Sequence, residues 1–172
     1  MSASSPITIR RARRDDVAAI VGMLADDHLG RARERIEDPL PATYTDAFAR
    51  LEADPNIALV VADDRGSVVG CLQLCILPGL SSQGASRALI EDVRVASNRR
   101  SRGIGEQLVR WAVAEARSQG CRLVELLTHQ TRVDAFLRAA RIFQEPCRHD
   151  DPVLAPGEYR RRRCQRCPLS IP

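Results

Sequence analysis

Residues 93–105 of the chain read Val-Arg-Val-Ala-Ser-Asn-Arg-Arg-Ser-Arg-Gly-Ile-Gly, and they join a predicted strand to a predicted helix. The unpaired backbone N–H groups at a helix N-terminus, together with the positive end of the helix dipole, form a binding site for anions. Gly103 and Gly105 lack side chains, so a ligand can approach these N–H groups closely, and the arginines beside them supply compensating charge. The stretch therefore predicts a site for a diphosphate group rather than a plain turn. Its spacing differs from the Rossmann and Walker motifs.

The elements on either side of this stretch are predicted from the spacing of apolar residues. Alternating residues predict a strand over residues 88–95, and an apolar stripe predicts a helix over residues 104–118, with Gly120 as its C-terminal cap. The stripe consists of Ile104, Leu108, Trp111, Ala112 and Ala116.

Regular alternation along this strand assigns its side chains to two faces. Glu91 then shares a face with Val93 and Val95. The opposite face carries Asp92 and Arg94. A carboxylate is thus predicted on each face of the strand that leads into the diphosphate site.

The rest of the chain predicts one mixed α/β domain with a mostly antiparallel sheet flanked by helices. A strand at residues 7–13 precedes a helix capped by Asp15 or Asp16, and two apolar runs form a hairpin around the turn Asp-Asp-Arg-Gly at residues 63–66. A charged, proline-broken loop at residues 28–44 leads into a short helix. The predicted ranges are 45–54 for this helix, 58–62 and 68–76 for the hairpin strands, and 121–127 for a final buried strand.

The composition is that of a soluble globular protein, with 44% hydrophobic and 28% charged residues. The sequence holds no apolar run of about 18 residues that would span a membrane, and its start lacks the apolar core of a signal peptide. We therefore expect a cytoplasmic protein without membrane contact. All 26 basic residues are arginine. GC-rich codon usage explains most of this bias, although arginine also suits phosphate binding.

The string Arg-Ser-Arg-Gly-Ile-Gly at residues 100–105 resembles the Arg/Gln-x-x-Gly-x-Gly/Ala motif of the GNAT N-acetyltransferases. As in that family, a strand ending in Val95 precedes the motif, and the likeness extends over residues 7–135. The resemblance implies a GNAT-like fold and acetyl-CoA as co-substrate, with a primary amine of a small molecule or peptide as acceptor. It also implies that the backbone of Val93, Arg94 and Val95 pairs with the pantetheine arm. The residues it implies around the phosphates are Arg100, Arg102, Gly103, Ile104, Gly105 and Glu106.

Acetyl transfer to an amine requires a neutral amine, and a carboxylate can take its proton directly or through water. Glu91 is the first candidate for this base because its predicted face matches that of Val93 and Val95. Asp92 is the second candidate. The alternative is that either residue is an ordinary strand carboxylate in a salt bridge.

Residues 136–172 depart from the GNAT pattern. The predicted helix at residues 136–143 lacks the family's tyrosine and Leu-Gly-Phe string, and the segment after it holds half of the ten prolines. Codon degeneracy permits residues 137–143 to encode Tyr-Glu-Arg-Leu-Gly-Phe in a frame displaced by one base, so we hypothesise a frameshifted C-terminus. We expect a GNAT domain over residues 1–135, with its C-terminal strands lost or altered, and a poorly packed segment over residues 136–172. The sheet edge this would expose favours a homodimer.

Three alternatives to an active enzyme follow from the same sequence. A folded acyl-CoA-binding protein with weak or no catalysis would share the diphosphate site. The basic tail could bind nucleic acid, but it lacks interleaved aromatic residues, so we expect no specific nucleic-acid partner. Four C-terminal side chains have tolerable zinc-ligand spacing without an element to preorganise them, so we expect no metal. These side chains are Cys147, His149, Cys164 and Cys167.

Overall fold

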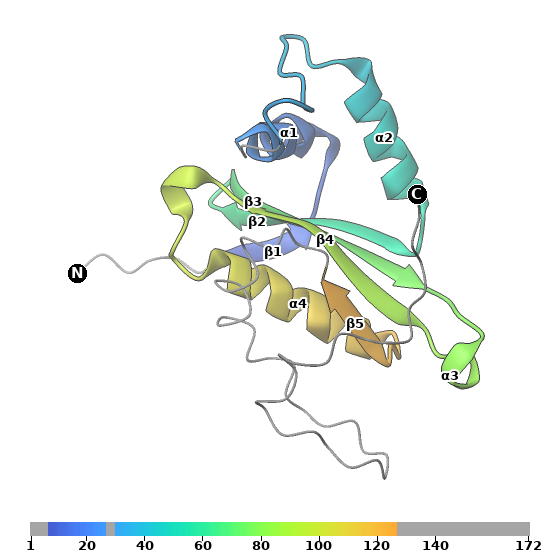
Figure 1. Cartoon of the computed structure of the whole chain (residues 1–172). Helices are drawn as coiled ribbons and strands as arrows, with labels where there is room; N and C mark the ends of the chain where they lie inside the picture. The colour runs from blue at the N-terminus through green and yellow to red at the C-terminus, as the bar shows by residue number, and fades with distance from the viewer. Residues whose placement is uncertain (1–6, 27–29, 127–172) are drawn as a thin grey trace, which may run out of the picture. The chain divides into compact units, whose positions relative to one another are not determined.

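A five-stranded sheet in the order β1-β2-β3-β4-β5 forms the framework of the described residues (Figure 1). The computed structural model describes residues 7–26 and 30–126. Strands β1 to β4 are each antiparallel to their neighbours, whereas β4 and β5 are parallel. The predicted mixed, mostly antiparallel sheet is thereby confirmed. The strands are β1 (Thr8–Arg11), β2 (Ile57–Asp64), β3 (Ser67–Leu77), β4 (Arg87–Val95) and β5 (Leu123–Leu126).

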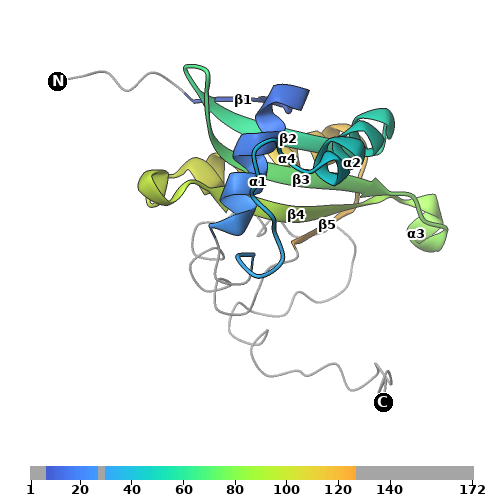
Figure 2. The ribbon, with the colours of Figure 1, turned by 90° about the horizontal axis from the view of Figure 1, so that it is seen from above.

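Helices cover both faces of the sheet (Figures 1 and 2). Helices α1 (Val17–Ala25) and α2 (Ala42–Ala53) lie on one face, and α4 (Ile104–Ser118) lies on the other. Helix α3 (Ser81–Gly84) is a single turn in the connection between β3 and β4. The connection of β4 to the parallel strand β5 through α4 is a βαβ unit, which places the N-terminus of α4 at the carboxyl end of β4.

Helix α2 begins three residues earlier than predicted, directly after Pro41, which occupies the N-cap position. The ring of Pro41 fixes its φ at −51°. Its carbonyl accepts a hydrogen bond from the Tyr44 N–H at 3.1 Å. The predicted loop before this helix is therefore shorter, and Tyr44 belongs to α2.

The turn between β2 and β3 forms as the sequence predicts. Arg65 and Gly66 both have positive φ, at 55° and 86°. Such a pair is typical of the two-residue turns whose twist matches an antiparallel hairpin. The Gly66 N–H also donates to Asp63 Oδ1 at 2.6 Å, which fixes the turn.

The core against α4 differs from the predicted stripe in two ways. Trp111 is only half-buried, whereas Val109 and Val113 are buried.

The final predicted strand is less buried than expected, since Leu123 in β5 is 52% exposed. Strand β5 is the last strand of the described sheet, so its outer edge has no described partner.

Arg10 in β1 holds the start of α1 against the hairpin. Its guanidinium donates to Asp16 Oδ2 at 2.7 Å and to Asp63 Oδ2 at 2.8 Å. The hydrogen bond from Arg10 lowers the pKa of Asp16, and the same cause lowers the pKa of Asp63. Asp16 precedes α1 as predicted, but its carboxylate binds Arg10 and the Arg13 N–H rather than capping the helix.

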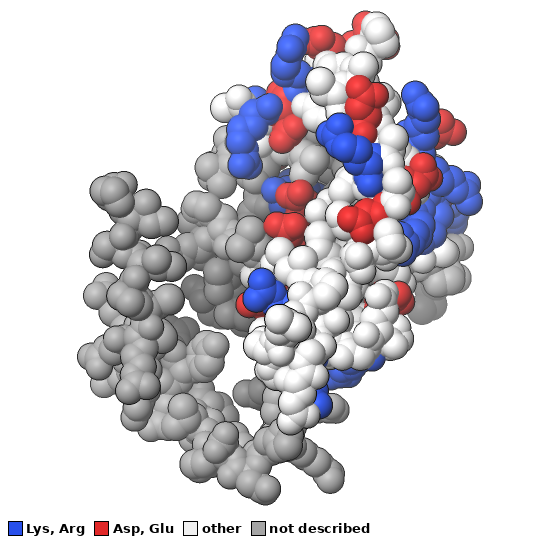
Figure 3. All heavy atoms as spheres, turned by 90° about the vertical axis from the view of Figure 1, so that its right-hand side faces the viewer, with Lys and Arg blue, Asp and Glu red and all other residues white. Residues whose placement is uncertain are grey.

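Charges of both signs are interspersed in the upper half of the face in Figure 3, where α1 and α2 lie.

Several predictions concern residues outside the described ranges. These are the boundary between residues 135 and 136, the altered C-terminal strands, the frameshift and the C-terminal cysteine and histidine ligands. Among the residues that the structure describes, no helix is long and apolar enough to cross a membrane.

Candidate functional site at the junction of β4 and α4

The predicted diphosphate site is a turn between the end of β4 and the start of α4. Gly103 occupies the N-cap position of α4, and its carbonyl accepts the first hydrogen bond of the helix, from the Gln107 N–H at 3.1 Å. The N–H groups of Ile104, Gly105 and Glu106 therefore precede the hydrogen-bond ladder of the helix. They form the donor set that an anion binds at a helix N-terminus.

The backbone of this turn explains one of its two glycines. Gly103 has a φ of 76°, in the left-handed region that glycine adopts without strain. A Cβ at Gly103 would have no atom within 4 Å, so the space in front of the turn is open. Ser101 adopts the same region, with a φ of 62°. The backbone conformation at residue 103 thus favours glycine, and the missing side chain leaves the first turn of α4 accessible.

Carboxylates from distant segments hold two of the arginines near the turn. Arg100 Nη2 lies 3.1 Å from Asp26 Oδ2 at the end of α1, and its Nε donates to the Val95 carbonyl at 3.2 Å. Arg99 Nη1 lies 2.9 Å from Asp64 Oδ2. A diphosphate on the N-terminus of α4 would therefore compete with Asp26 for the exposed guanidinium of Arg100.

Two further residues implied at the phosphates have exposed or paired side chains. Arg102 is exposed beside Gly103. The Glu106 carboxylate accepts a hydrogen bond from Arg110 Nη2 at 2.6 Å, one turn further along α4. Glu106 therefore contributes its backbone N–H to the donor set, while its negative charge is offset by Arg110.

A β-bulge at Asp92 overturns the predicted assignment of faces on β4. Leu72 of β3 lies opposite two residues of β4, because the register shifts by one between Glu91 and Arg94. Asp92 has a φ of 49°, a left-handed conformation that Asp tolerates better than most residues. Period-2 alternation therefore breaks at this residue.

The bulge brings the charged side chains of β4 onto one face of the sheet. Directly opposite residues of an antiparallel pair share a face. Glu91 pairs with Gln73 and Arg94 with Cys71, and both partners face α1 and α2. Val95 pairs with Gly70, which lies against α4. The prediction that Glu91 and Val95 lie on the same face of the sheet is wrong. The prediction that Glu91 and Arg94 lie on different faces is also wrong.

Each candidate base has a distinct environment. Glu91 Oε2 lies 3.4 Å from Gln73 Nε2 and 3.8 Å from Cys75 Sγ, so a neutral amide and a thiol contact this carboxylate. Asp92 Oδ1 lies 3.8 Å from Arg94 Nη2, and the Asp92 side chain is 54% exposed. The ion pair anticipated as the alternative is present for Asp92. The roles of both carboxylates stay predictions.

The edge of β4 next to the turn is available along one side. Strand β3 pairs with β4 on one edge over the length of the strand, whereas the described part of β5 pairs only with residues 87–90 on the other edge. Residues 91–95 have no described strand on that second edge. The backbone of Val93, Arg94 and Val95 therefore offers the edge that the resemblance implies for a pantetheine arm.

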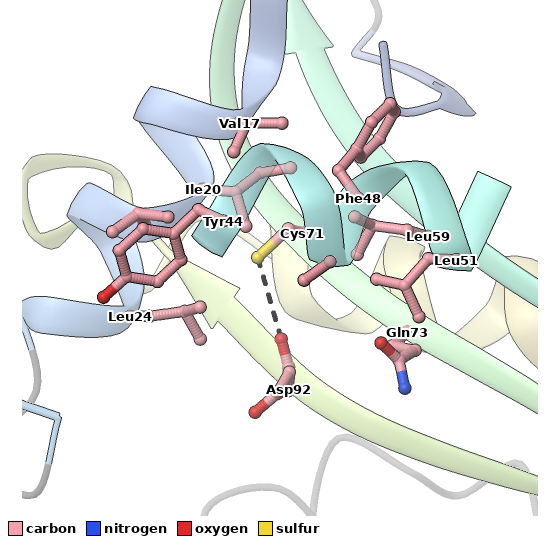
Figure 4. Close-up of a pocket in the computed structure, with 12 residues that line it drawn as sticks. Val17, Ile20, Leu24, Tyr44, Phe48, Leu51, Leu59, Cys71, Gln73 and Asp92 are labelled. Carbon is pink, nitrogen blue, oxygen red and sulfur yellow. Dashed lines mark hydrogen bonds between the residues drawn. The ribbon is translucent and has the colours of Figure 1, made fainter. Parts of the chain in front are cut away.

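A cavity of about 160 Å³ lies between α1, α2 and the sheet (Figure 4). The apolar side chains of the two helices face Cys71, Gln73 and Asp92 on the sheet. The sequence did not predict this cavity, because side chains that line a cavity and side chains of a filled core have the same helical spacing. The lining residues are Val17, Ile20, Val21, Leu24, Tyr44, Ala47, Phe48, Leu51, Leu59, Cys71, Gln73 and Asp92.

Cys71 lies in the cavity wall but is poorly suited to nucleophilic chemistry. Burial raises the pKa of its thiol to about 12, and its Sγ donates to the Asp92 carbonyl at 3.7 Å. The reactive form of a cysteine is the thiolate, which is scarce at such a pKa.

Within residues 7–26 and 30–126, no group of three metal-binding side chains is present.

Comparison with known proteins places the chain in a family. The model of the acetyltransferase (GNAT) family matches residues 18–147, and the chain belongs to this family. The crystal structure of a transcriptional regulator from Bacillus halodurans C-125 is similar, with 43% identity and a TM-score of 0.76 over 87% of this chain and 99% of that chain. A putative acetyltransferase from Agrobacterium tumefaciens str. C58 has 26% identity and a TM-score of 0.69, with coverage of 86% of this chain and 100% of that chain.

A curated relative matches over a shorter stretch. The chain is 36% identical over 92 residues to an aminoalkylphosphonate N-acetyltransferase of Salmonella typhimurium. The match covers 54% of this chain and 59% of that protein.

Proposed function

We propose that the protein transfers the acetyl group of acetyl-CoA to a primary amine of a small molecule or peptide. The observation that carries the proposal is the open N-terminus of α4, with Gly103 in a left-handed conformation and Arg100 beside it. Membership of the GNAT family supports the proposal, since enzymes of this family use acetyl-CoA.

The turn fits the diphosphate of CoA on three counts. The N–H groups of residues 104–106 point out of the helix start, and the positive end of the helix dipole favours the same anion. Arg100 and Arg102 place two guanidinium groups at the turn. The edge of residues 93–95, which has no partner strand among the described residues, then guides an extended pantetheine arm back along β4 towards Glu91.

The carboxylates on the inner face of β4 supply the proton chemistry. A carboxylate takes the proton of the acceptor ammonium, and the neutral nitrogen attacks the thioester carbonyl carbon. The C–N bond forms, the C–S bond breaks, and the proton that the acylated nitrogen loses balances the one that the departing thiolate takes up to give the amide and free CoA. Glu91 is the first candidate for the base and Asp92 the second. Asp92 lines the cavity and Glu91 contacts Gln73, which also lines it, and this favours an enzyme over a protein that only binds acyl-CoA.

Calorimetric titration of the full chain with CoA and with pantetheine tests this assignment. Pantetheine lacks the nucleotide diphosphate but keeps the arm and the thiol. We expect CoA to bind at least about a hundredfold more tightly, because the diphosphate accepts two or more charge-assisted hydrogen bonds that contribute about 1.5–3 kcal/mol each. The difference should shrink at high salt, since the turn is exposed. Equal affinity for the two compounds would show that the turn does not hold a diphosphate.

A further inference from the structure

We infer that the cavity between α1, α2 and the sheet binds the hydrocarbon part of the acceptor, so the substrate is a primary amine on a compact apolar group. This inference rests on the proposed function for the identity of the reaction, but the binding that it describes is measurable without turnover. It concerns the substrate class, which neither the fold nor the diphosphate site defines.

The lining of the cavity is the first argument. Nine of the twelve lining residues are apolar, from Val17 on α1 to Leu59 on β2 and Cys71 on β3. The cavity is partly open to solvent, so a ligand can enter it from outside. An apolar cavity of about 150 Å³ binds benzene, so a cavity of about 160 Å³ matches a phenyl ring or a short alkyl chain.

The positions of the polar residues are the second argument. Asp92 and Gln73 line the cavity from the sheet, opposite the apolar side chains of the helices (Figure 4). Asp92 lines the cavity while its side chain is 54% exposed, so its carboxylate can receive the cationic end of a ligand whose apolar body fills the cavity. Gln73 also contacts Glu91, so an ammonium at Asp92 lies on the same face as the first candidate for the base.

The charge of the lining separates two kinds of amine. The cavity is lined by no Arg or His side chain among the described residues, and the chain has no lysine. Arg94 lies beside Asp92 but does not line the cavity. A phosphonate placed inside would lose its hydration without gaining a cation, which is costly. The lining therefore favours an apolar amine over one that carries an anionic group.

Benzylamine and aminomethylphosphonate form a matched pair of probes, because each joins one large group to the same CH₂–NH₂ unit. Thiol release from acetyl-CoA gives kcat/KM for each amine. We expect benzylamine to exceed aminomethylphosphonate by at least about tenfold, the low end of what a single methylene group is worth in an apolar pocket. An equal or higher kcat/KM for aminomethylphosphonate would overturn the inference and leave acetyl transfer itself intact.

Two variants on α2 locate the binding. Ala47 lines the cavity, whereas Ala49 is exposed on the same helix. Ala47→Phe should fill the cavity and lower kcat/KM for benzylamine at least about tenfold, while KM for acetyl-CoA stays unchanged. Ala49→Phe should leave both quantities unchanged. Equal effects of the two variants would show that the amine binds elsewhere. Melting curves confirm that each variant folds, and Ala47→Leu serves as a smaller increment if Ala47→Phe does not.

The melting temperature reports amine binding even if no acetyl transfer occurs, so it separates failure of the reaction from failure of the proposed amine site. A ligand that binds the folded state raises the melting temperature, whether or not it reacts. Benzylamine should raise the melting temperature of the wild type and of Ala49→Phe, but not that of the cavity-filled variant. If no amine is acetylated, this pattern still supports the cavity as an amine site. No shift in the wild type, without turnover, would contradict it.

Discussion

Glu91→Gln is expected to lower kcat by about a hundredfold or more, because the variant keeps the shape of the side chain but cannot take a proton. The affinity for CoA should be unchanged, since the diphosphate site lies at the other end of the β4 segment. Steady-state thiol release at saturating acetyl-CoA measures the first quantity, and calorimetry measures the second. Glu125→Gln is a suitable control, because Glu125 is an exposed carboxylate on the neighbouring strand.

The same measurement on Asp92→Asn separates the roles of the two carboxylates. If Asp92 holds the ammonium, its amide variant should mainly raise KM for the amine, whereas Glu91→Gln should mainly lower kcat. Unchanged kcat in Glu91→Gln would remove Glu91 as the base. A large loss of kcat in Asp92→Asn alone would transfer that role to Asp92, and no loss in either would leave the proton to water.

Gly103→Val is expected to weaken CoA binding by about a hundredfold or more, equivalent to the loss of two charge-assisted hydrogen bonds at about 1.5–3 kcal/mol each. A valine side chain would stand in the open space before the first turn of α4, where the diphosphate approaches the N–H groups. The φ of 76° also disfavours any β-branched residue. Calorimetric titration with CoA measures the loss.

Gly120→Val is the matched control for this variant. Gly120 follows the C-terminal end of the same helix with a φ of 74°, and a Cβ there has no atom within 4 Å. Both substitutions should therefore destabilise the fold similarly, by about 1–2 kcal/mol from the left-handed conformation alone. Only Gly103→Val should lower the affinity for CoA. Equal affinity in the two variants would mean that the turn at Gly103 does not contact the coenzyme.

Local sequence patterns predict the parts of the site that depend on neighbouring residues. The turn at residues 100–105 is such a part, because its glycine and the start of α4 act through the backbone. The hairpin turn at Arg65 and Gly66 is another. In both places the sequence predicts a turn and a glycine adopts a positive φ within it, Gly103 at 76° and Gly66 at 86°, so the structure confirms these two turns.

The arrangement of the carboxylates could not be predicted in the same way. A period-2 pattern assumes that no residue is inserted, and the apolar spacing of β4 carries no mark of the bulge at Asp92. One extra residue reverses every face assignment that follows it. A positive φ at an Asp is compatible with the sequence but is not required by it, whereas a glycine there would have drawn attention to the position.

Contacts between segments far apart in the chain could not be predicted from sequence patterns either. The pair of Arg100 with Asp26 joins residues 74 positions apart and depends on how α1 packs on the sheet. The cavity likewise depends on the separation of α1 from α2. Ile20 and Phe48 have the spacing of core residues whether they touch each other or enclose a void.

Detection of the acetylated amine by mass spectrometry shows whether the protein is an N-acetyltransferase. The full chain is incubated with acetyl-CoA and benzylamine, and free thiol is measured in the same sample. We expect N-acetylbenzylamine, with one free thiol for each acetylated molecule and far less of both in Gly103→Val. Binding of CoA without any acetylated product, over a panel that also includes aminoalkylphosphonates and peptide amines, would contradict the proposed acetyl transfer and show an acyl-CoA-binding protein instead.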